Sequence, residues 1–229
     1  MDARDYEARR VEAEHIAFIT HELRNPLGTA MLTATQLADA PAAKRSRLWE
    51  LLHRSHRRLR DLVDSVLVLE EVATSQVLPV LAEITLGELL GPLLVKAELA
   101  ARAKGLVFMA TVDPDLVAWV DRKLATSALQ NVVDNAIKYS DEGKVAIVVV
   151  EQPAHVVVHV YDSCEGLSEE ELAVVFEPFR RGRFDKSGSG LGLAIAQRAL
   201  LAQGGSIGGE STGEGGCHFW LTLPKAARP

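Results

Sequence analysis

The sequence contains little cysteine, few aromatic residues and no long apolar run. Its two cysteines, Cys164 and Cys217, are too few for the disulfide framework of a small secreted domain. No apolar stretch reaches the roughly 20 residues that a membrane-spanning helix needs, and no signal peptide opens the chain. We therefore expect a cytoplasmic chain without a membrane segment, which leaves room for a sensor or membrane region upstream in a longer natural protein.

The chain also lacks an excess of basic residues. Its 25 lysine and arginine residues are outnumbered by 31 aspartate and glutamate residues, which gives a net charge of −6. Because a nucleic-acid backbone requires a basic surface, we expect no nucleic-acid partner. With 48% hydrophobic residues, the 229-residue chain is long enough to bury one or two cores.

The first 74 residues carry a helical pattern. Apolar positions recur at spacings of three and four in two stripes, separated by "DAPAAK". The stripes comprise Ile16, Ile19, Leu23, Leu27, Ala30, Ala34 and Leu37, and then Leu48, Leu52, Ser55, Leu59, Leu62, Val66, Leu69 and Ala73. This pattern predicts an antiparallel helical hairpin over residues 1–74. Since two helices cannot bury such a narrow seam alone, it also predicts a homodimer in which two hairpins form a four-helix bundle.

Residues 85–229 have the pattern of an α+β domain, which follows a predicted linker over residues 75–84. Capping boxes at Thr85–Glu88 and Ser168–Glu171, and a cap at Asp121, predict three helix starts. Strands are predicted at "GLVFMATV", "KVAIVVVE", "HVVVHVYD", "GGSIGGES" and "CHFWLTLP", and a further helix at "LGLAIAQRALLAQ". Helices mixed with strands that are joined by short turns predict a layer of helices on one sheet.

The stretch "FITHELRNPL" on the first helix combines a histidine, a glutamate and a proline. With the apolar stripe in the seam, His21 takes the heptad position farthest from it and faces solvent. Glu22 can accept the proton of one ring nitrogen, which makes the other nitrogen a better nucleophile. Pro26 has no N–H, so the carbonyl of Glu22 loses its helical partner and the helix bends there. The competing interpretation is an exposed His–Glu pair without a function.

Polar residues at helical spacing mark "LQNVVDNAIKYS". Asn131 and Asn135 are four residues apart and share a helix face, with Lys138 and Tyr139 one turn further on. Carboxamide oxygens suit Mg²⁺, and a lysine suits the charge of a phosphate. An asparagine pair alone is also compatible with an ordinary polar surface.

Three further motifs follow along the chain. In "VYDSCEG", Asp162 ends a strand just before a tight turn at Gly166, where a carboxylate can accept from an exocyclic amine such as that of adenine. The segment "VFEPFRRG" places Phe176 and Phe179 beside Pro178. In "GSGLGLAIAQ", three glycines open a helix whose free N–H groups suit phosphate oxygens. These glycines do not form a Walker loop or a dinucleotide fingerprint, because the Gly-Lys-Ser/Thr ending and the preceding strand are missing.

In this order the motifs resemble those of the sensor histidine kinases of two-component signalling, and the resemblance covers nearly the whole chain. "FITHELRNPL" is similar to the H-box of that family, "NVVDNAIKY" to the N-box, "DSCEG" to the G1-box, "VFEPF" to the F-box and "GSGLGL" to the G2-box. The resemblance implies a dimerisation and phosphotransfer hairpin followed by a Bergerat-type (GHKL) α/β sandwich. It also implies ATP bound under a lid over roughly residues 178–189, where the sequence is charged and rich in small residues.

The resemblance also implies roles for individual residues. His21 would be the phosphoacceptor, Glu22 its general base, and Asn25 the residue that orients water for dephosphorylation of a response regulator. Asn135 would bind Mg²⁺, Asp162 would read adenine, and Arg181 would neutralise charge on the γ-phosphate. The remaining nucleotide contacts would be Asn131, Lys138, Tyr139, Gly166, Phe179, Gly188, Gly190, Leu191 and Gly192.

The implied partners are a second copy of the chain and a response-regulator receiver domain. The basic run "HRSHRRLR" on the second helix would help to dock the receiver domain; otherwise that run is a solvated face.

Two positions depart from the family pattern. Cys164 stands where the G1-box has its first glycine, and Gly216 stands where the last glycine motif continues with threonine. A Cβ at position 164 would be strained at positive φ or would crowd the nucleotide; the simpler interpretation is a tolerated small residue rather than a redox sensor. These departures leave open a degraded kinase that acts as a phosphatase or scaffold.

A gyrase-like or chaperone-like ATPase of the same fold is disfavoured, because those proteins carry glutamate in place of Asn131 and lack the histidine hairpin.

Overall fold

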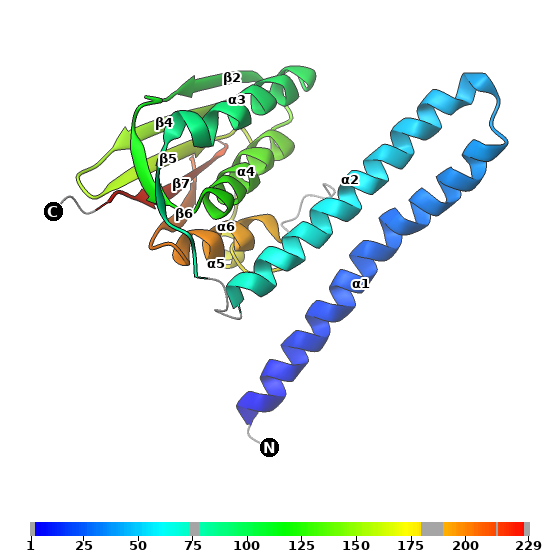
Figure 1. Cartoon of the computed structure of the whole chain (residues 1–229), viewed down its shortest axis with the longest axis horizontal. Coiled ribbons are helices and arrows are strands. Elements are labelled where there is room, and N and C mark those ends of the chain that lie inside the picture. The colour runs from blue at the N-terminus through cyan, green and yellow to red at the C-terminus, as the bar shows by residue number, and fades with distance from the viewer. Residues whose placement is uncertain (1–2, 74–77, 180–189, 214, 227–229) are drawn as a thin grey trace. The chain divides into compact units, whose positions relative to one another are not determined.

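A computed structural model of the chain describes residues 3–73, 78–179, 190–213 and 215–226. The chain divides into two compact units, Met1–Leu67 and Val68–Pro229 (Figure 1). Within the described ranges, none of the helices combines the length and apolar character needed to cross a membrane.

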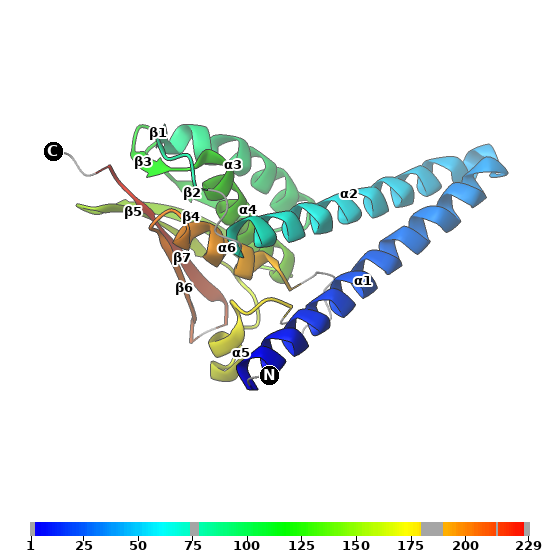
Figure 2. The same cartoon turned by 60° about the horizontal axis from the view of Figure 1, so that its bottom comes forward.

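The N-terminal unit is built from two long helices. Helix α1 spans Ala3–Ala38 and helix α2 spans Ala42–Ala73, with a short turn between them, so they form the predicted antiparallel hairpin (Figures 1 and 2). Polar residues buried in this unit have partners, because the Thr33 hydroxyl donates to the Thr29 carbonyl at 2.6 Å and the Ser55 hydroxyl donates to the Leu51 carbonyl at 3.1 Å. Buried hydroxyls of this kind cost little when they bond within their own helix.

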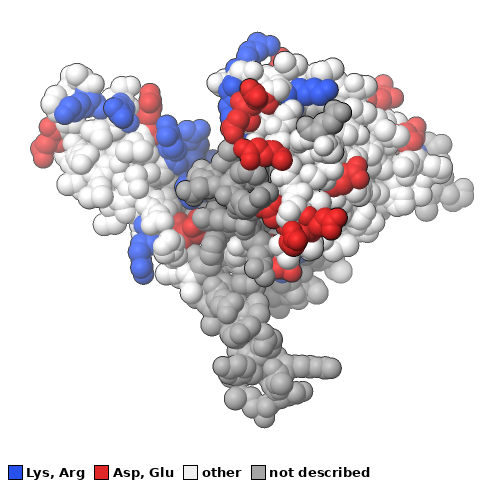
Figure 3. All heavy atoms as spheres, turned by 180° about the vertical axis from the view of Figure 1, so that it is seen from behind, with Lys and Arg blue, Asp and Glu red and all other residues white. Residues whose placement is uncertain are grey.

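Large apolar side chains remain on the outside of this hairpin. Leu27, Met31 and Leu32 on α1 are 49%, 64% and 68% exposed, and Leu51 and Val63 on α2 are also exposed. On the face shown in Figure 3, charged side chains lie mainly along the edges of the hairpin and leave an uncharged area between them. Of these five residues only Leu27 belongs to the apolar stripe predicted from the sequence, so a single copy of the chain leaves apolar surface exposed mainly beside that stripe.

The C-terminal unit is an α/β layer structure around a five-stranded sheet of order β2-β4-β5-β7-β6. The strands are β2 (Val107–Thr111), β4 (Lys144–Glu151), β5 (His155–Tyr161), β6 (Ser206–Ser211) and β7 (Cys217–Pro224). The β2–β4 pair is parallel and the other pairs are antiparallel. Helices α3 (Leu86–Ala103), α4 (Arg122–Tyr139) and α6 (Gly192–Leu201) cover one face of this sheet (Figure 2), and α5 (Glu169–Val174) is a short helix after β5. The predicted fold class, a helical hairpin and an α/β ATPase-type sandwich, is confirmed.

Three of these helices begin where the sequence predicts. Thr85 and Ser168 each form a complete capping box with the glutamate three residues on. Asp121 caps α4, since its carboxylate accepts the Leu124 N–H at 3.1 Å. These side chains satisfy N–H groups that the helix itself leaves unpaired, so each start is fixed locally.

A second, two-stranded sheet was not predicted from the sequence. Strand β1 (Ala82–Thr85) pairs antiparallel with β3 (Val117–Val120). Residues 82–84, which the sequence predicted to be linker, therefore lie in a strand. Each strand is only four residues long, and such short segments do not carry enough alternation to be distinguished from loop.

The core lies between the five-stranded sheet and the three helices. Alternate residues of β5, Val156, Val158 and Val160, join the same buried cluster as Leu129 and Val132 of α4. This alternation fixes which face of each strand meets the helices. It also places the carboxyl end of β5, where Asp162 follows, beside the start of β7.

Candidate functional site

The first group of predicted site residues lies on α1. The His21 side chain is 68% exposed, on the solvent-facing side that the heptad pattern predicts. Glu22 is different, because only 6% of its side chain is exposed and its Oε2 lies 3.3 Å from Nη2 of Arg58 on α2. Its Oε1 lies 3.9 Å from Nδ1 of His21. The exposed imidazole therefore has a buried, charge-paired carboxylate next to its Nδ1, and this is not the pair of exposed side chains of the competing interpretation.

Arg58 is a residue that the sequence reasoning missed. It lies in the basic run "HRSHRRLR", which was interpreted as a solvated face or a docking surface. The structure turns this one guanidinium toward Glu22, 36 residues earlier in the chain, and leaves the neighbouring Arg57 exposed. The predicted antiparallel hairpin is the signal that could have identified Arg58, because it places the segment of α2 around Arg58 beside the segment of α1 around Glu22.

Asn25 and Pro26 follow His21 by four and five residues, between one and two helical turns further along α1. The Asn25 side chain is exposed, and its carbonyl accepts the Thr29 hydroxyl at 3.1 Å. Pro26 is buried inside α1, and the helix is continuous through it. The missing N–H of the proline thus removes one hydrogen bond next to the His21–Glu22 pair without ending the helix.

The second group of predicted residues lies on α4. Asn131 donates from Nδ2 to the Ser127 carbonyl at 2.9 Å, and its Oδ1 would lie 3.0 Å from a Cβ added at Gly192. Glycine at position 192 therefore lets the start of α6 approach Asn131 closely. Asn135 is half-buried, and no hydrogen bond joins its carboxamide to any residue of the described ranges. Its oxygen is available to a ligand.

The last turn of α4 carries the predicted cationic contact. Lys138 donates from Nζ to the Tyr139 hydroxyl at 2.9 Å and lies 4.3 Å from the centre of the tyrosine ring. Lys104, from the end of α3, donates from its own Nζ to the carbonyls of Ile137, Lys138 and Ser140 at 2.8, 3.0 and 2.7 Å. This ammonium group satisfies the open carbonyls at the end of α4 and so fixes the segment that presents Lys138.

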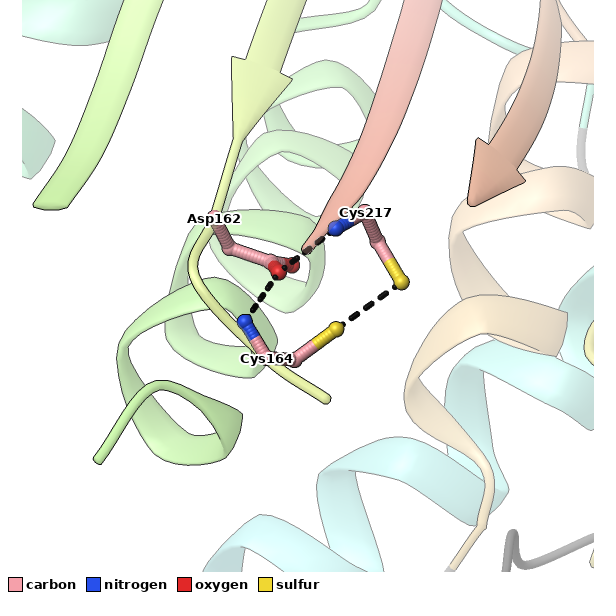
Figure 4. A group of neighbouring side chains, drawn as sticks. All are labelled: Asp162, Cys164 and Cys217. Atoms are coloured by element: carbon pink, nitrogen blue, oxygen red, sulfur yellow. Dashed lines mark hydrogen bonds between the residues drawn. The ribbon is translucent and has the colours of Figure 1, made fainter. Parts of the chain in front are cut away.

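Asp162 follows β5 and is held by backbone groups. Its Oδ1 accepts the N–H of Cys164 and the N–H of Cys217, each at 3.0 Å (Figure 4), and its own N–H donates to the Cys217 carbonyl at 3.0 Å. Burial raises the pKa of the Asp162 carboxyl, while the bonds from Cys164 and Cys217 act in the opposite direction. The carboxylate is fixed in place with its acceptor capacity only partly used.

Hydrogen bonds that involve three serines hold the loop after Asp162 in place. The Ser163 N–H donates to the buried Ser140 hydroxyl at 3.0 Å, and the Ser163 hydroxyl donates to the Lys144 carbonyl at 2.9 Å. The Leu167 N–H donates to the Ser211 hydroxyl at 2.9 Å. These serines lie at the ends of α4, β5 and β6, so their convergence could not be deduced from spacing along the chain.

The two departures from the family pattern are accommodated by the backbone. Among the described residues other than glycine, only Phe179 has a positive φ, so Cys164 is free of the backbone strain that a positive φ would bring, as expected for a tolerated small residue. Gly216 has a φ of 105°, and a Cβ there would lie 2.5 Å from the Asp162 carbonyl oxygen. Threonine would not fit at position 216, since the turn before β7 requires glycine.

The F-box and the glycine-rich segment meet at the start of α6. Phe179, at a φ of 66°, donates from its N–H to the Gly190 carbonyl at 2.9 Å and packs against Leu191 and Ile195. Leu191 provides no side-chain cap for α6, so within the described part of the chain no side chain caps the first N–H groups of this ten-residue helix, and they suit an anionic ligand. Arg181 and Gly188 lie outside the described residues.

The residues present fit a nucleoside triphosphate and a divalent cation. Asp162 offers an acceptor for an amine. The turn that follows it has a φ of 83° at Gly166, which glycine adopts without strain. The open start of α6 offers N–H donors to phosphate oxygens, and the unbonded Asn135 carboxamide offers a hard oxygen ligand. The described residues that are predicted to contact the nucleotide thus come from α4, the β5–α5 loop, the segment after α5 and the start of α6, all within the C-terminal unit.

Comparisons with known proteins agree with this geometry. Residues 120–227 match the family "Histidine kinase-, DNA gyrase B-, and HSP90-like ATPase", and residues 12–74 match the "His Kinase A (phospho-acceptor) domain". The sensor-like histidine kinase SenX3 of Mycobacterium tuberculosis is 30% identical over 97% of this chain and 56% of its own length. The sensor protein GacS of Pseudomonas syringae is 29% identical over 96% of this chain and 26% of its own length. The chain thus spans between about a quarter and just over half of these curated relatives.

Solved structures give the same result. The catalytic domain of the histidine kinase ThkA is 31% identical, covering 63% of this chain and 97% of that one, with a TM-score of 0.57. Full-length ShkA in complex with AMPPNP is 27% identical, covering 94% of this chain and 47% of that one, with a TM-score of 0.71. The histidine kinase AdeS of Acinetobacter baumannii shares the fold, with a TM-score of 0.72 at 22% identity over 90% of this chain and 98% of its own.

Proposed function

The chain belongs to the sensor histidine kinases, and we propose that it acts as a homodimeric kinase core that phosphorylates His21 from Mg·ATP and passes the phosphoryl group to an aspartate of a response regulator. The observation that carries this proposal is the His21–Glu22–Arg58 arrangement, in which an exposed imidazole adjoins a buried carboxylate. An ordinary surface histidine has no such partner. The same chain also carries a site whose residues suit ATP.

The nucleotide is bound by residues of the C-terminal unit. The Asp162 carboxylate accepts from the exocyclic amine of adenine, and the open N–H groups at the start of α6 receive the phosphates. The Asn135 carboxamide would hold Mg²⁺ beside the phosphates, and the cation would supply charge neutralisation there. Lys138 adds a positive charge at the end of α4, and Arg181 adds one in the predicted lid.

The phosphoryl transfer follows from the orientation of His21. Its Nδ1 lies on the side of Glu22, so Nε2 is the attacking nitrogen. As the bond from Nε2 to the γ-phosphorus forms, the bond from phosphorus to the bridging oxygen of ATP breaks and ADP leaves. Glu22 takes the Nδ1 proton, and Arg58 holds the Glu22 carboxylate in position. A receiver-domain aspartate then accepts the phosphoryl group, and Asn25, four residues after His21, orients water for the reverse function of dephosphorylation.

Dimerisation is supported by the exposed apolar side chains of the hairpin. Leu27, Met31 and Leu32 on α1 and Leu51 and Val63 on α2 remain exposed in a single copy. Packing against a second hairpin buries such residues in a four-helix bundle. The match of residues 12–74 to the phospho-acceptor domain family agrees with this assembly.

A degraded kinase that acts as a scaffold is less well supported. The scaffold hypothesis was based on Cys164 and Gly216. Cys164 does not have a positive φ, and Gly216 has a positive φ that glycine adopts without strain. The backbone strain that motivated a loss of ATP binding is absent at Cys164.

The test is phosphorylation by γ-labelled ATP in the presence of Mg²⁺. We expect a base-stable, acid-labile label that is lost in His21→Gln and kept in His56→Gln, a matched change at an exposed histidine of α2. A label that is acid-stable, or that survives His21→Gln, would contradict the proposal. An unlabelled protein that still binds ATP would favour the scaffold.

A further inference from the structure

The two cysteines of the chain meet beside Asp162. Cys164 lies in the loop after β5 and Cys217 opens β7, 53 residues later, yet their Sγ atoms are 2.9 Å apart (Figure 4). Both are free thiols in the structure. Cys164 is half-buried, whereas Cys217 is only 2% exposed. The pair combines one accessible and one inaccessible sulfur at the nucleotide site.

This geometry favours a disulfide over a metal site. Asp162, Cys164 and Cys217 offer three ligand atoms within 4.8 Å of one another. However, two thiolates on a tetrahedral Zn²⁺ lie about 3.7 Å apart, given Zn–S bonds of about 2.3 Å. The observed 2.9 Å is shorter than that and approaches the S–S bond of about 2.05 Å.

We propose that Cys164 and Cys217 form a redox-active dithiol, and that their disulfide weakens the binding of ATP. The inference rests on the proposed function, because it assigns a regulation to the same nucleotide site. It does not require the hairpin or the response regulator.

The oxidant is a peroxide, and Cys164 reacts first because it is the more accessible sulfur. Its thiolate attacks one peroxide oxygen, the O–O bond breaks, and the departing oxygen leaves as water with the displaced proton. The resulting sulfenic acid is attacked by Cys217: the S–S bond forms, the S–O bond breaks, and a second water leaves with the Cys217 proton. Two thiols and one hydrogen peroxide thus give one disulfide and two waters.

The electrostatics fit this order of events. The hydrogen bond to Cys164 and then burial raise the pKa of the Cys217 thiol, and the nearby Asp162 carboxylate adds to the effect. Cys217 therefore stays protonated until its neighbour has been oxidised.

The consequence for ATP follows from the backbone of the same two residues. The N–H groups of Cys164 and Cys217 are the two donors that hold Asp162 Oδ1. The Gly166 N–H donates to Cys164 Sγ at 3.2 Å, so a shift of this sulfur also disturbs the turn at Gly166. Closing the sulfurs from 2.9 Å to about 2.05 Å moves the acceptor for adenine. We expect ATP to bind about tenfold more weakly, which corresponds to one hydrogen bond of good geometry.

The experiment uses the whole chain, fully reduced and then treated with hydrogen peroxide. Mass spectrometry under non-reducing conditions reads the disulfide as the loss of two hydrogen atoms, and titration with ATP reads the affinity. Since the chain has only two cysteines, an intramolecular disulfide is necessarily Cys164–Cys217. Cys164→Ser and Cys217→Ser are each compared with themselves before and after peroxide, so that a variant that folds poorly does not decide the result.

We expect the wild type to lose affinity on oxidation and to regain it with dithiothreitol, and both variants to be insensitive. Absence of the disulfide, or a disulfide without a change in affinity, would overturn the inference. So would tight Zn²⁺ binding by the reduced wild type that both serine variants abolish and that protects the thiols from peroxide. If the reduced protein does not bind ATP at all, the proposed function fails and the regulation fails with it, a result distinct from binding that oxidation does not change.

Discussion

His21 and Asp162 are positioned in different ways. The partners of His21 are the next residue, Glu22, and one arginine on the adjacent helix of a hairpin. Asp162 is instead held by Cys164, by Cys217 and, through the following loop, by serines at the ends of α4 and β6. The histidine centre is therefore local, and a change there removes chemistry with little effect on the fold. The nucleotide site is assembled from distant segments, so a change that breaks the contacts between those segments lowers stability, whereas one that keeps them affects binding alone.

The largest effect that sharpens this contrast is expected for Asp162→Asn. The asparagine oxygen can still accept the N–H groups of Cys164 and Cys217, so the fold should be kept, but its amide cannot replace the carboxylate as an acceptor. ATP should bind about 100-fold more weakly, as expected for loss of a hydrogen bond to a charged group. Isothermal titration calorimetry with ATP and thermal unfolding measure the two quantities.

The pH dependence of ATP affinity should also differ between the wild type and Asp162→Asn. Burial raises the pKa of the Asp162 carboxyl above its ordinary value of 3.8. Binding requires the ionised form, so wild-type affinity should fall as the pH decreases through this raised pKa, and Asp162→Asn should lack that decrease. A wild type and a variant with the same pH profile would show that Asp162 does not contact the nucleotide.

The next effect concerns stability at the nucleotide site. Gly216→Thr, which restores the residue expected from the family motif, places a Cβ 2.5 Å from the Asp162 carbonyl at a φ of 105°. We expect a loss of about 2 kcal/mol or more in the free energy of unfolding, measured by denaturant titration. Gly213→Thr in the same loop is the control, because nothing lies within 4 Å of its added Cβ. Equal losses in the two variants would argue against the close packing at Gly216.

The smallest of the three effects is expected for Arg58→Ala, which tests whether His21 depends only on Glu22 and Arg58. Arg58→Ala releases the Glu22 carboxylate from its ion pair, so phosphorylation of His21 should slow by about tenfold. The KM for ATP should not change, because the proposed role of Arg58 is to position the Glu22 carboxylate and not to contact the nucleotide. Arg57→Ala, at the adjacent exposed position, should be neutral. Rescue by Arg58→Lys would support the charge pair, and a raised KM in Arg58→Ala would contradict this role.

The elements themselves were largely predictable from the sequence. The capping boxes at Thr85 and Ser168 set helix starts because both partners lie within one turn. The valine-rich stretches "KVAIVVVE" and "HVVVHVYD" predicted a strand pair, and they form β4 and β5, which pair as neighbours. The strands β1 and β3 were missed, because each is four residues long and becomes a strand only by pairing with the other.

The sequence by itself determined the hairpin, the solvent-facing position of His21 and the helices and strands that carry the nucleotide motifs, because these depend on periodicity and on contacts within a few residues. Only the tertiary structure decided that Glu22 is buried against Arg58, that Gly216 cannot be threonine, and that Cys164 meets Cys217 beside Asp162. The physical reason is that these contacts join residues 36 to 55 positions apart. Strand order and helix pairing bring such residues together, and no spacing along the chain encodes their distance.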